Sequence, residues 1–175
     1  KAALREADFP VLAANILNEE DKSNPFDSNV IIEINGFEIG VFGITTPETK
    51  VKASPLNTKG LEFADPVTVA KEQVARLNEQ GADAIIMLSH LGTDAESAVN
   101  TYTVLDSVEG IDLVVDGHSH SYLPEGEVYN DVLIVSTGEY LENIGLVSLT
   151  FTDGELSGKT AQLIGFTEAL QYTAD

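Results

Sequence analysis

Three histidines are the residues of this sequence whose type and spacing could do chemistry. His90 follows the apolar run 84–88, whereas His118 and His120 follow the apolar run 111–115. Neutral imidazole is the commonest protein ligand for transition metals. If the two runs are neighbouring parallel strands, all three rings emerge at one edge of the sheet, where open α/β sheets place their ligands. The sequence therefore predicts a metal site formed by these histidines.

The hypothesis rests on joint placement, because any one histidine at a strand end is more often an ordinary polar surface residue. His118 and His120 lie on one side of the backbone if the chain between them is extended. Gly117 lets the chain bend closely around a bound ion. Asp116 could orient an imidazole by accepting its second N–H. Adjacent serines do not by themselves indicate a nucleophile, so no catalytic residue is assigned.

The charge distribution also favours a metal. The chain carries nine Lys and Arg against 29 Asp and Glu, a net charge of −20. No basic residue occurs between Arg76 and Lys159. An anion bound near the histidines would therefore need a metal ion rather than a lysine or arginine to hold it. The acidic surroundings should attract divalent cations.

Composition excludes several classes of protein. A net charge of −20 repels nucleic acid and anionic lipid, which argues against a nucleic-acid polymer as partner. The 175 residues suit one domain, and 43% hydrophobic residues indicate a globular chain. The absence of cysteine rules out disulfides and thiolate sites. No apolar run approaches the roughly 18 residues of a membrane span.

A strand–helix–strand unit must position the histidines. Asp65 and Pro66 begin a predicted helix that Gly81 ends. The apolar run 84–88 follows as a strand covered on both faces. Thr93 and Glu96 resemble a capping box and predict a second helix over residues 94–107, ahead of the strand 111–115. Such a crossover makes the two strands parallel neighbours.

Antiparallel pieces are expected on either side of this unit. Asn-Gly, Asn-Asp and Asp-Gly turns predict three hairpins, with strands at 30–34 and 37–44, at 127–129 and 132–135, and at 145–151 and 156 onward. The apolar run 9–16 predicts a buried strand. We expect loops over residues 18–29 and 48–63.

The two histidine motifs resemble a known family. Leu88-Ser89-His90-Leu91-Gly92 and Val115-Asp116-Gly117-His118-Ser119-His120 resemble the C-terminal half of the metallophosphoesterase domain of the 5′-nucleotidase family, in the calcineurin-like superfamily. Further landmarks follow in the family's order at residues 9–16, 43–49, 81–83 and 137–140, so the resemblance covers about residues 8–166.

The resemblance implies a fold and an activity. The fold would be α/β, part of a four-layer α/β/β/α sandwich with parallel core strands and antiparallel hairpins. His90, His118 and His120 would be metal ligands of a dinuclear centre of divalent ions, with Mn, Zn, Fe or Ca possible. The two ions would clamp phosphate oxygens and generate a hydroxide nucleophile. The substrate would be a nucleotide 5′-monophosphate or a related nucleotide.

Two alternatives stay open. The first is a 2′,3′-cyclic-nucleotide phosphodiesterase or a nucleotide-sugar hydrolase of the same superfamily. The second is a non-catalytic fragment that binds a metal or a partner through the acidic face. Members of the family are commonly exported or attached to the cell surface, which implies an extracellular, surface or periplasmic location.

The sequence also departs from the family pattern. The Asp-x-His, Gly-Asp and Gly-Asn-His-Glu elements that should precede residue 8 are not present. We therefore expect residues 1–166 to be the C-terminal half of a catalytic domain, with 167–175 as a linker or helical turn and 1–5 as the tail of a helix. The isolated chain should be a poor catalyst. An uncovered sheet face should bind the N-terminal half or a second chain.

Overall fold

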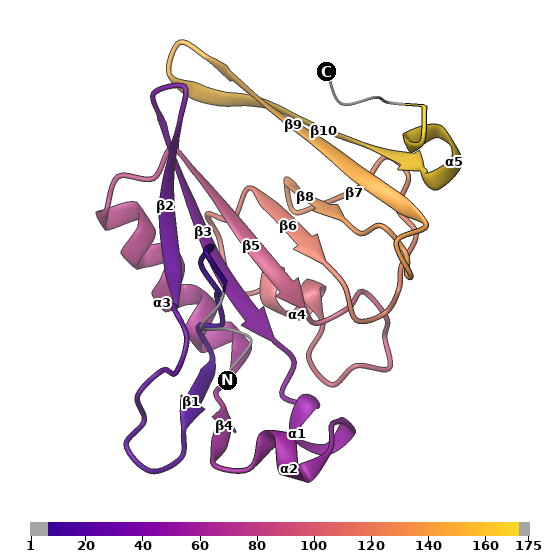
Figure 1. Cartoon of the computed structure of the whole chain (residues 1–175). Coiled ribbons are helices and arrows are strands. Elements are labelled where there is room, and N and C mark those ends of the chain that lie inside the picture. The colour runs from indigo at the N-terminus through magenta and orange to yellow at the C-terminus, as the bar shows by residue number, and fades with distance from the viewer. Residues whose placement is uncertain (1–6, 172–175) are drawn as a thin grey trace.

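A six-stranded sheet positions the histidines (Figure 1). The structure, a computed structural model, describes residues 7–171. The strand order is β2-β3-β5-β6-β8-β7. The strands are β2 (Asn29–Ile34), β3 (Phe37–Thr45), β5 (Ala84–His90), β6 (Leu113–Asp116), β7 (Glu127–Tyr129) and β8 (Val132–Val135). The inner strands β3, β5, β6 and β8 are parallel, whereas β2 and β7 pair antiparallel at the two edges.

The expected strand–helix–strand unit is confirmed. Strands β5 and β6 are parallel neighbours, with Leu88 opposite Val115. Helix α3 (Pro66–Glu79) begins where the Asp65 carboxylate accepts the Thr68 N–H at 2.7 Å. Because β5 and β6 run parallel, their carboxyl ends meet at one edge of the sheet, as the histidine hypothesis requires.

The second predicted helix is much shorter than residues 94–107. Helix α4 spans Thr101–Leu105, and its cap is Asn100 rather than Thr93. The hydroxyl of Thr93 instead lies 2.6 Å from that of Ser121. Asp94 accepts the backbone N–H and the hydroxyl of Ser97 and so closes a turn of its own. Thr93 therefore begins a loop instead of capping a helix, because its side chain has a tertiary partner.

The apolar run 9–16 is a strand only at its last residue, Ile16, so the prediction of a strand over residues 9–15 is wrong. Its backbone crosses the end of β3 and forms an isolated bridge in which Ala13 donates to Asp27 and Asp27 donates to Val11, and Ala14 donates to Gly43. A Cβ on Gly43 would lie 2.2 Å from the Leu12 carbonyl oxygen, so only glycine permits this crossing. The pairing begins later, where β1 (Ile16–Asn18) meets β4 (Leu61–Phe63).

The expected loop over residues 48–63 contains further short elements. Helices α1 (Thr49–Lys52) and α2 (Pro55–Thr58) precede β4. Each helix is four residues long, too short for an apolar stripe to reveal it in the sequence. The three hairpins are confirmed, and every turn has two residues with positive φ, as type I′ turns require.

The two faces of the sheet are covered differently. Helices α3 and α4 cover one face, where Phe42, Met87, Val114 and Ile134 are fully buried. The last hairpin, β9 (Asn143–Thr152) with β10 (Glu155–Gly165), crosses the other face (Figure 1). It leads into α5 (Phe166–Ala169). The helix tail expected over residues 1–5, and the end of the 167–175 segment, lie outside the described residues.

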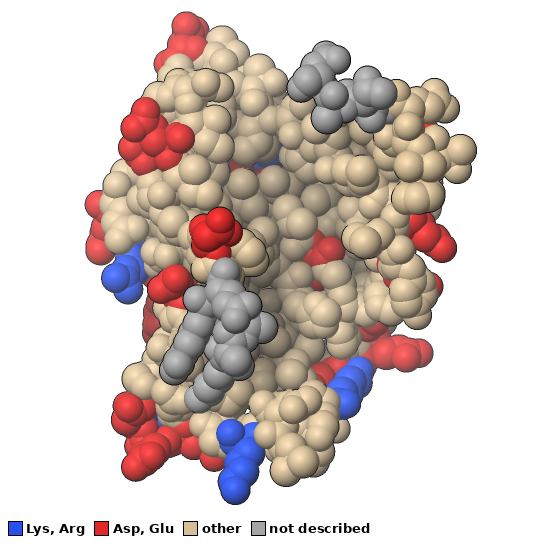
Figure 2. All heavy atoms as spheres, in the orientation of Figure 1, with Lys and Arg blue, Asp and Glu red and all other residues tan. Residues whose placement is uncertain are grey.

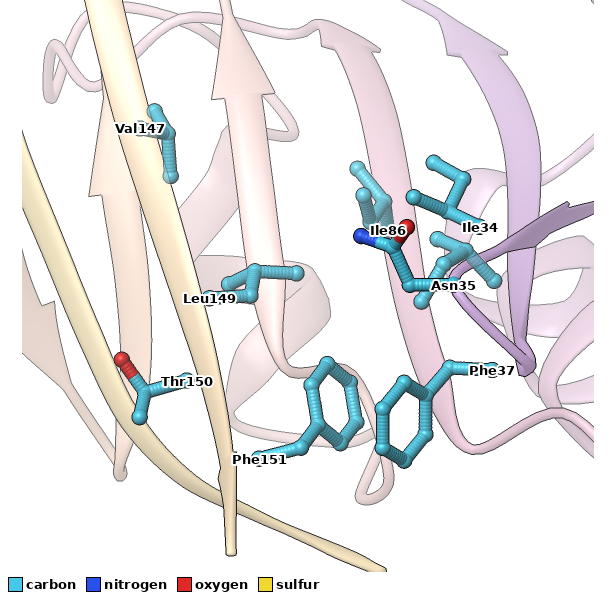
Figure 3. Close-up of a pocket in the computed structure, with 9 residues that line it drawn as sticks. Ile34, Asn35, Phe37, Ile86, Val147, Leu149, Thr150 and Phe151 are labelled. Atoms are coloured by element: carbon cyan, nitrogen blue, oxygen red, sulfur yellow. The ribbon is translucent and has the colours of Figure 1, made fainter.

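The hairpin covers its face of the sheet only in part. A cavity of about 560 Å³ separates the hairpin from β3 and β5, and Phe37 stacks on Phe151 at its rim with ring centroids 4.0 Å apart (Figure 3). Leu88 and Val115 on the inner strands stay 40% and 39% exposed. Charged side chains lie mostly along the margins of the molecule in this view (Figure 2). The described residues thus leave an apolar sheet face open.

Candidate metal centre

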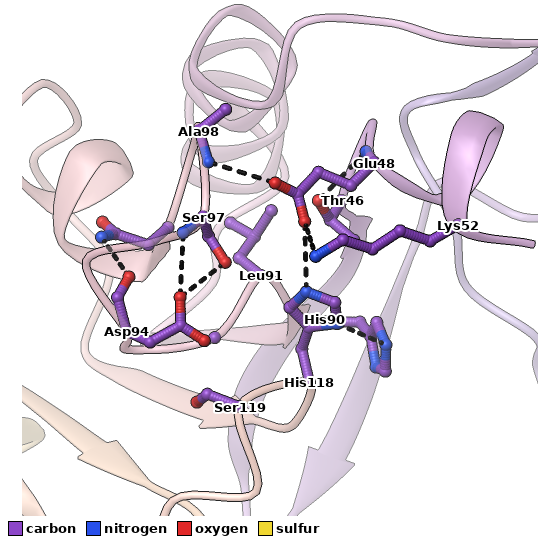
Figure 4. Close-up of polar contacts among 12 residues, drawn as sticks. Thr46, Glu48, Lys52, His90, Leu91, Asp94, Ser97, Ala98, His118 and Ser119 are labelled. Atoms are coloured by element: carbon purple, nitrogen blue, oxygen red, sulfur yellow. Dashed lines mark hydrogen bonds and ion pairs between the residues drawn. The ribbon is translucent and has the colours of Figure 1, made fainter.

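His90 and His118 face each other at the carboxyl edge of the sheet (Figure 4). His90 is the last residue of β5, and His118 follows β6 by two residues. The distance from His90 Nε2 to His118 Nδ1 is 3.3 Å, and the ring planes are tilted by 60°. The structure therefore brings together two of the three predicted ligands, from segments 28 residues apart.

His120 is not part of this facing pair and has a different partner. Both His118 and His120 have positive φ, at 68° and 53°, so the backbone between them is not extended as the prediction assumed. The His120 side chain is 59% exposed, and its Nδ1 lies 2.7 Å from Glu139 Oε2. Among residues 7–171 no group of three or more His, Asp or Glu side chains is arranged to hold a metal ion.

Asp116 fixes the two turns that carry His90 and His118. Its Oδ1 accepts backbone N–H groups from Leu91, Gly92 and Gly117, at 3.3, 3.2 and 2.7 Å. Its Oδ2 accepts the Thr101 hydroxyl at 2.6 Å. No described hydrogen bond joins Asp116 to a histidine, so the idea that it orients an imidazole directly is replaced by an action through the backbone. The buried carboxylate holds both turns against each other.

Glu48 is the residue that sequence reasoning missed. It follows β3, and its carboxylate lies beside His118, with Oε2 at 3.5 Å from Nε2 (Figure 4). That oxygen is buried and makes no hydrogen bond of normal geometry, although Lys52 Nζ lies 2.5 Å away. The sequence carries one signal for it, because residues 43–49 resemble a family landmark and follow a parallel strand to the same sheet edge as His90.

The protonation of the site suits metal binding. Burial lowers the pKa of His90, and the neighbouring His118 lowers it further. His90 is therefore neutral at pH 7 and has a lone pair to donate. The Lys52 ammonium, followed by the Ala98 backbone N–H, lowers the pKa of Glu48. Its carboxylate is ionised at the same pH.

The spacing of His90 and His118 fits two ligands of one divalent ion. Two imidazole nitrogens that each lie about 2.1 Å from one ion, at an angle near 100°, are roughly 3.2 Å apart. The His90 and His118 nitrogens are 3.3 Å apart. The buried oxygen of Glu48 beside them adds negative charge that a cation would offset. The pair thus matches two ligands of one metal ion.

Known proteins are similar to this chain in sequence. A 5′-nucleotidase of Diplobatis ommata is 31% identical over an alignment that covers 87% of this chain and 29% of that protein. An uncharacterized metallophosphoesterase of Bacillus subtilis, YunD, is 29% identical over 93% of this chain and 34% of its own length. The chain thus spans about a third of the length of these curated relatives. No family model matches it.

Solved structures agree with this relationship. A 5′-nucleotidase precursor from Thermus thermophilus superposes with a TM-score of 0.73 and 26% identity, over 93% of this chain and 34% of that one. The sulfate thiohydrolase SoxB of Thermus thermophilus superposes with a TM-score of 0.86 over 98% of this chain and 31% of that one. Because SoxB is only 23% identical to this chain, its superposition shows a shared fold and nothing more.

Proposed function

Because the chain belongs to the 5′-nucleotidase family of calcineurin-like metallophosphoesterases, we propose that it is part of a metal-dependent hydrolase of nucleotide 5′-monophosphates or related nucleotides. In this proposal residues 1–166 form the C-terminal half of the catalytic domain and residues 167–175 lead out of it. The observation that supports it most is the facing pair of His90 and His118 at the sheet edge.

The proposal gives each histidine a role. His90 and His118 hold one ion, and His120 holds the second ion of a dinuclear centre. Divalent ions held there would supply positive charge for the phosphate and a hydroxide nucleophile. His120 must leave Glu139 to take its role, because its ring nitrogen now lies 2.7 Å from that carboxylate. Asp116 keeps the two histidine turns in register throughout.

In this proposal the remaining metal ligands come from residues outside this chain of 175. Either an N-terminal half of the catalytic domain or a second chain supplies them. The open apolar face next to the histidine edge, with Leu88 and Val115 exposed, supports such a neighbour. No described helix is long and apolar enough to cross a membrane. One relative in Thermus thermophilus is described as a precursor, which favours an exported location.

An alternative function is a non-catalytic module that binds one ion and a partner. The pairing of His120 with Glu139, rather than with the other two histidines, favours it for the chain alone. Within the enzymes, a 2′,3′-cyclic-nucleotide phosphodiesterase or a nucleotide-sugar hydrolase shares the same metal chemistry.

Phosphate release tests the proposal. The protein that contains this chain is incubated with Mn²⁺ and a nucleoside 5′-monophosphate, a 2′,3′-cyclic nucleotide or a nucleotide sugar. We expect fastest turnover of the 5′-monophosphate. His118→Ala should lower turnover by more than the roughly 10–100-fold typical of residues behind the metal ligands. Glu62→Gln, in an exposed ion pair with Lys22, should have no effect. Unchanged turnover in His118→Ala would refute the assignment.

A further inference from the structure

Glu48 is held in place by its own turn. The chain leaves β3 at Thr46, whose backbone N–H bonds the His90 carbonyl oxygen at 3.1 Å. The Glu48 N–H lies 3.3 Å from the Thr46 hydroxyl, and the Glu48 carbonyl oxygen accepts the Lys52 N–H at 2.8 Å. These bonds tie the residue to the strand end that carries His90. The backbone of Glu48 therefore has a fixed relation to the metal centre.

The Glu48 carboxylate is braced from two further sides. Its Oε1 accepts the Ala98 backbone N–H at 3.3 Å, which links it to the loop before α4. Its Oε2 faces the Lys52 ammonium at 2.5 Å and His118 Nε2 at 3.5 Å (Figure 4). The side chain is only 18% exposed. A carboxylate held by three segments has a constant orientation toward the His118 ring.

The His118 ring lies between two different partners. Its Nε2 faces the Glu48 carboxylate, which can only accept hydrogen bonds, and its Nδ1 faces His90 Nε2 at 3.3 Å. A neutral imidazole has one N–H. With the proton on Nδ1, the Nε2 lone pair would point at the negative carboxylate. With the proton on Nε2, the N–H lies on the side of the carboxylate, and the Nδ1 lone pair can accept the His90 Nε2–H or bind a metal ion.

We propose that Glu48 is the positioning residue of the metal centre, which holds the proton of His118 on Nε2 and so presents Nδ1 as the metal-binding nitrogen next to His90. It acts through the imidazole and touches neither ion nor substrate. A partner on the second nitrogen fixes both the tautomer and the ring orientation of a metal-ligating histidine. The identity of the ligand rests on the proposed function, whereas the tautomer is a property of the metal-free chain.

Nitrogen NMR tests the tautomer directly. Long-range ¹⁵N–¹H correlation spectra of the metal-free 175-residue chain, at mildly alkaline pH where imidazoles are neutral, separate protonated from unprotonated ring nitrogens. The wild-type chain should show His118 with its proton on Nε2. In Glu48→Gln the two tautomers should both be populated. Glu19→Gln, which also removes a carboxylate paired with a lysine but lies away from the histidines, should match the wild type.

Zinc titration supplies the second readout. Glu48→Gln should weaken Zn²⁺ binding by about 10–100-fold, and Glu19→Gln should leave it unchanged. A wild-type His118 with its proton on Nδ1 would overturn the inference, and this result needs no variant to fold. Failure of the wild-type chain to bind Zn²⁺, with the Nε2 tautomer intact, would overturn the proposed metal site and leave only the control of the His118 tautomer by Glu48 standing.

Discussion

Asp116 is the residue on which both histidine turns depend. Its carboxylate is buried and accepts three backbone N–H groups that lie immediately after His90 or before His118. Hydrogen bonds to a charged group contribute roughly 1.5–3 kcal/mol each. Loss of the charge therefore affects stability and the separation of the two rings together.

Asp116→Asn should lower the free energy of unfolding by about 2–4 kcal/mol, because an amide places a donor where the carboxylate accepts backbone N–H or hydroxyl groups. Urea denaturation measures the change. Asp153→Asn, at an exposed turn position with φ of 54° that asparagine tolerates, is the matched control and should stay within about 0.5 kcal/mol of the wild type. Equal stability of the two variants would show that Asp116 does not hold the turns.

At the scale of elements, the parallel unit β5–α4–β6 could be predicted from the sequence because its strands are continuous apolar runs. The hairpins could be predicted because their turn residues tolerate positive φ. The path of residues 9–15 over Gly43 could not be predicted, since the backbone of this segment bonds Asp27 and β3, which lie far along the chain. Glu48 could not be assigned for the same reason, because its partners Ala98 and His118 are joined only by the tertiary fold.

The contact of Tyr102 on α4 with Glu127 on β7 makes the free energy of unfolding depend on pH in the alkaline range. Burial, followed by the hydrogen bond to Glu127, raises the pKa of Tyr102 to about 12. The unfolded chain titrates near 10. Since the folded pKa is higher, the stabilising contribution is complete below about pH 10 and is lost as pH rises toward 12.

Tyr102→Phe should therefore make the free energy of unfolding fall less steeply between about pH 10 and 12. At neutral pH the same change should lower the free energy of unfolding, because the hydrogen bond to Glu127 is lost. Chemical denaturation at a series of pH values measures the slope. Tyr122→Phe, at a 60% exposed tyrosine, should keep the wild-type slope. A slope that Tyr102→Phe leaves unchanged would refute the role given to this pair.

At the scale of the molecule, the uncovered sheet face should decide how the chain behaves in solution. Leu88 and Val115 lie opposite each other on the two strands that carry the histidines, and both are exposed. Exposed apolar patches of several hundred Å² mark interaction surfaces. We expect the chain to dimerise or to bind a dye that fluoresces on apolar surface.

Leu88→Asn together with Val115→Thr should reduce both dimerisation and dye binding, measured by light scattering and fluorescence. Val51→Ser is the control, because Val51 is 82% exposed but lies on α1 and not on the sheet face. A compact wild-type monomer with no dye binding would contradict an open face.

The most direct test of the account is the metal content of the chain after incubation with Zn²⁺ and desalting. The facing nitrogens of His90 and His118 predict one ion per chain, lost in His90→Ala and in His118→Ala and retained in His120→Ala, since His120 pairs with Glu139 in this structure. Two tightly held ions in the wild type would mean that ligands arrive from a second chain. No ion, or an ion that His118→Ala does not release, would contradict the metal centre proposed at this edge.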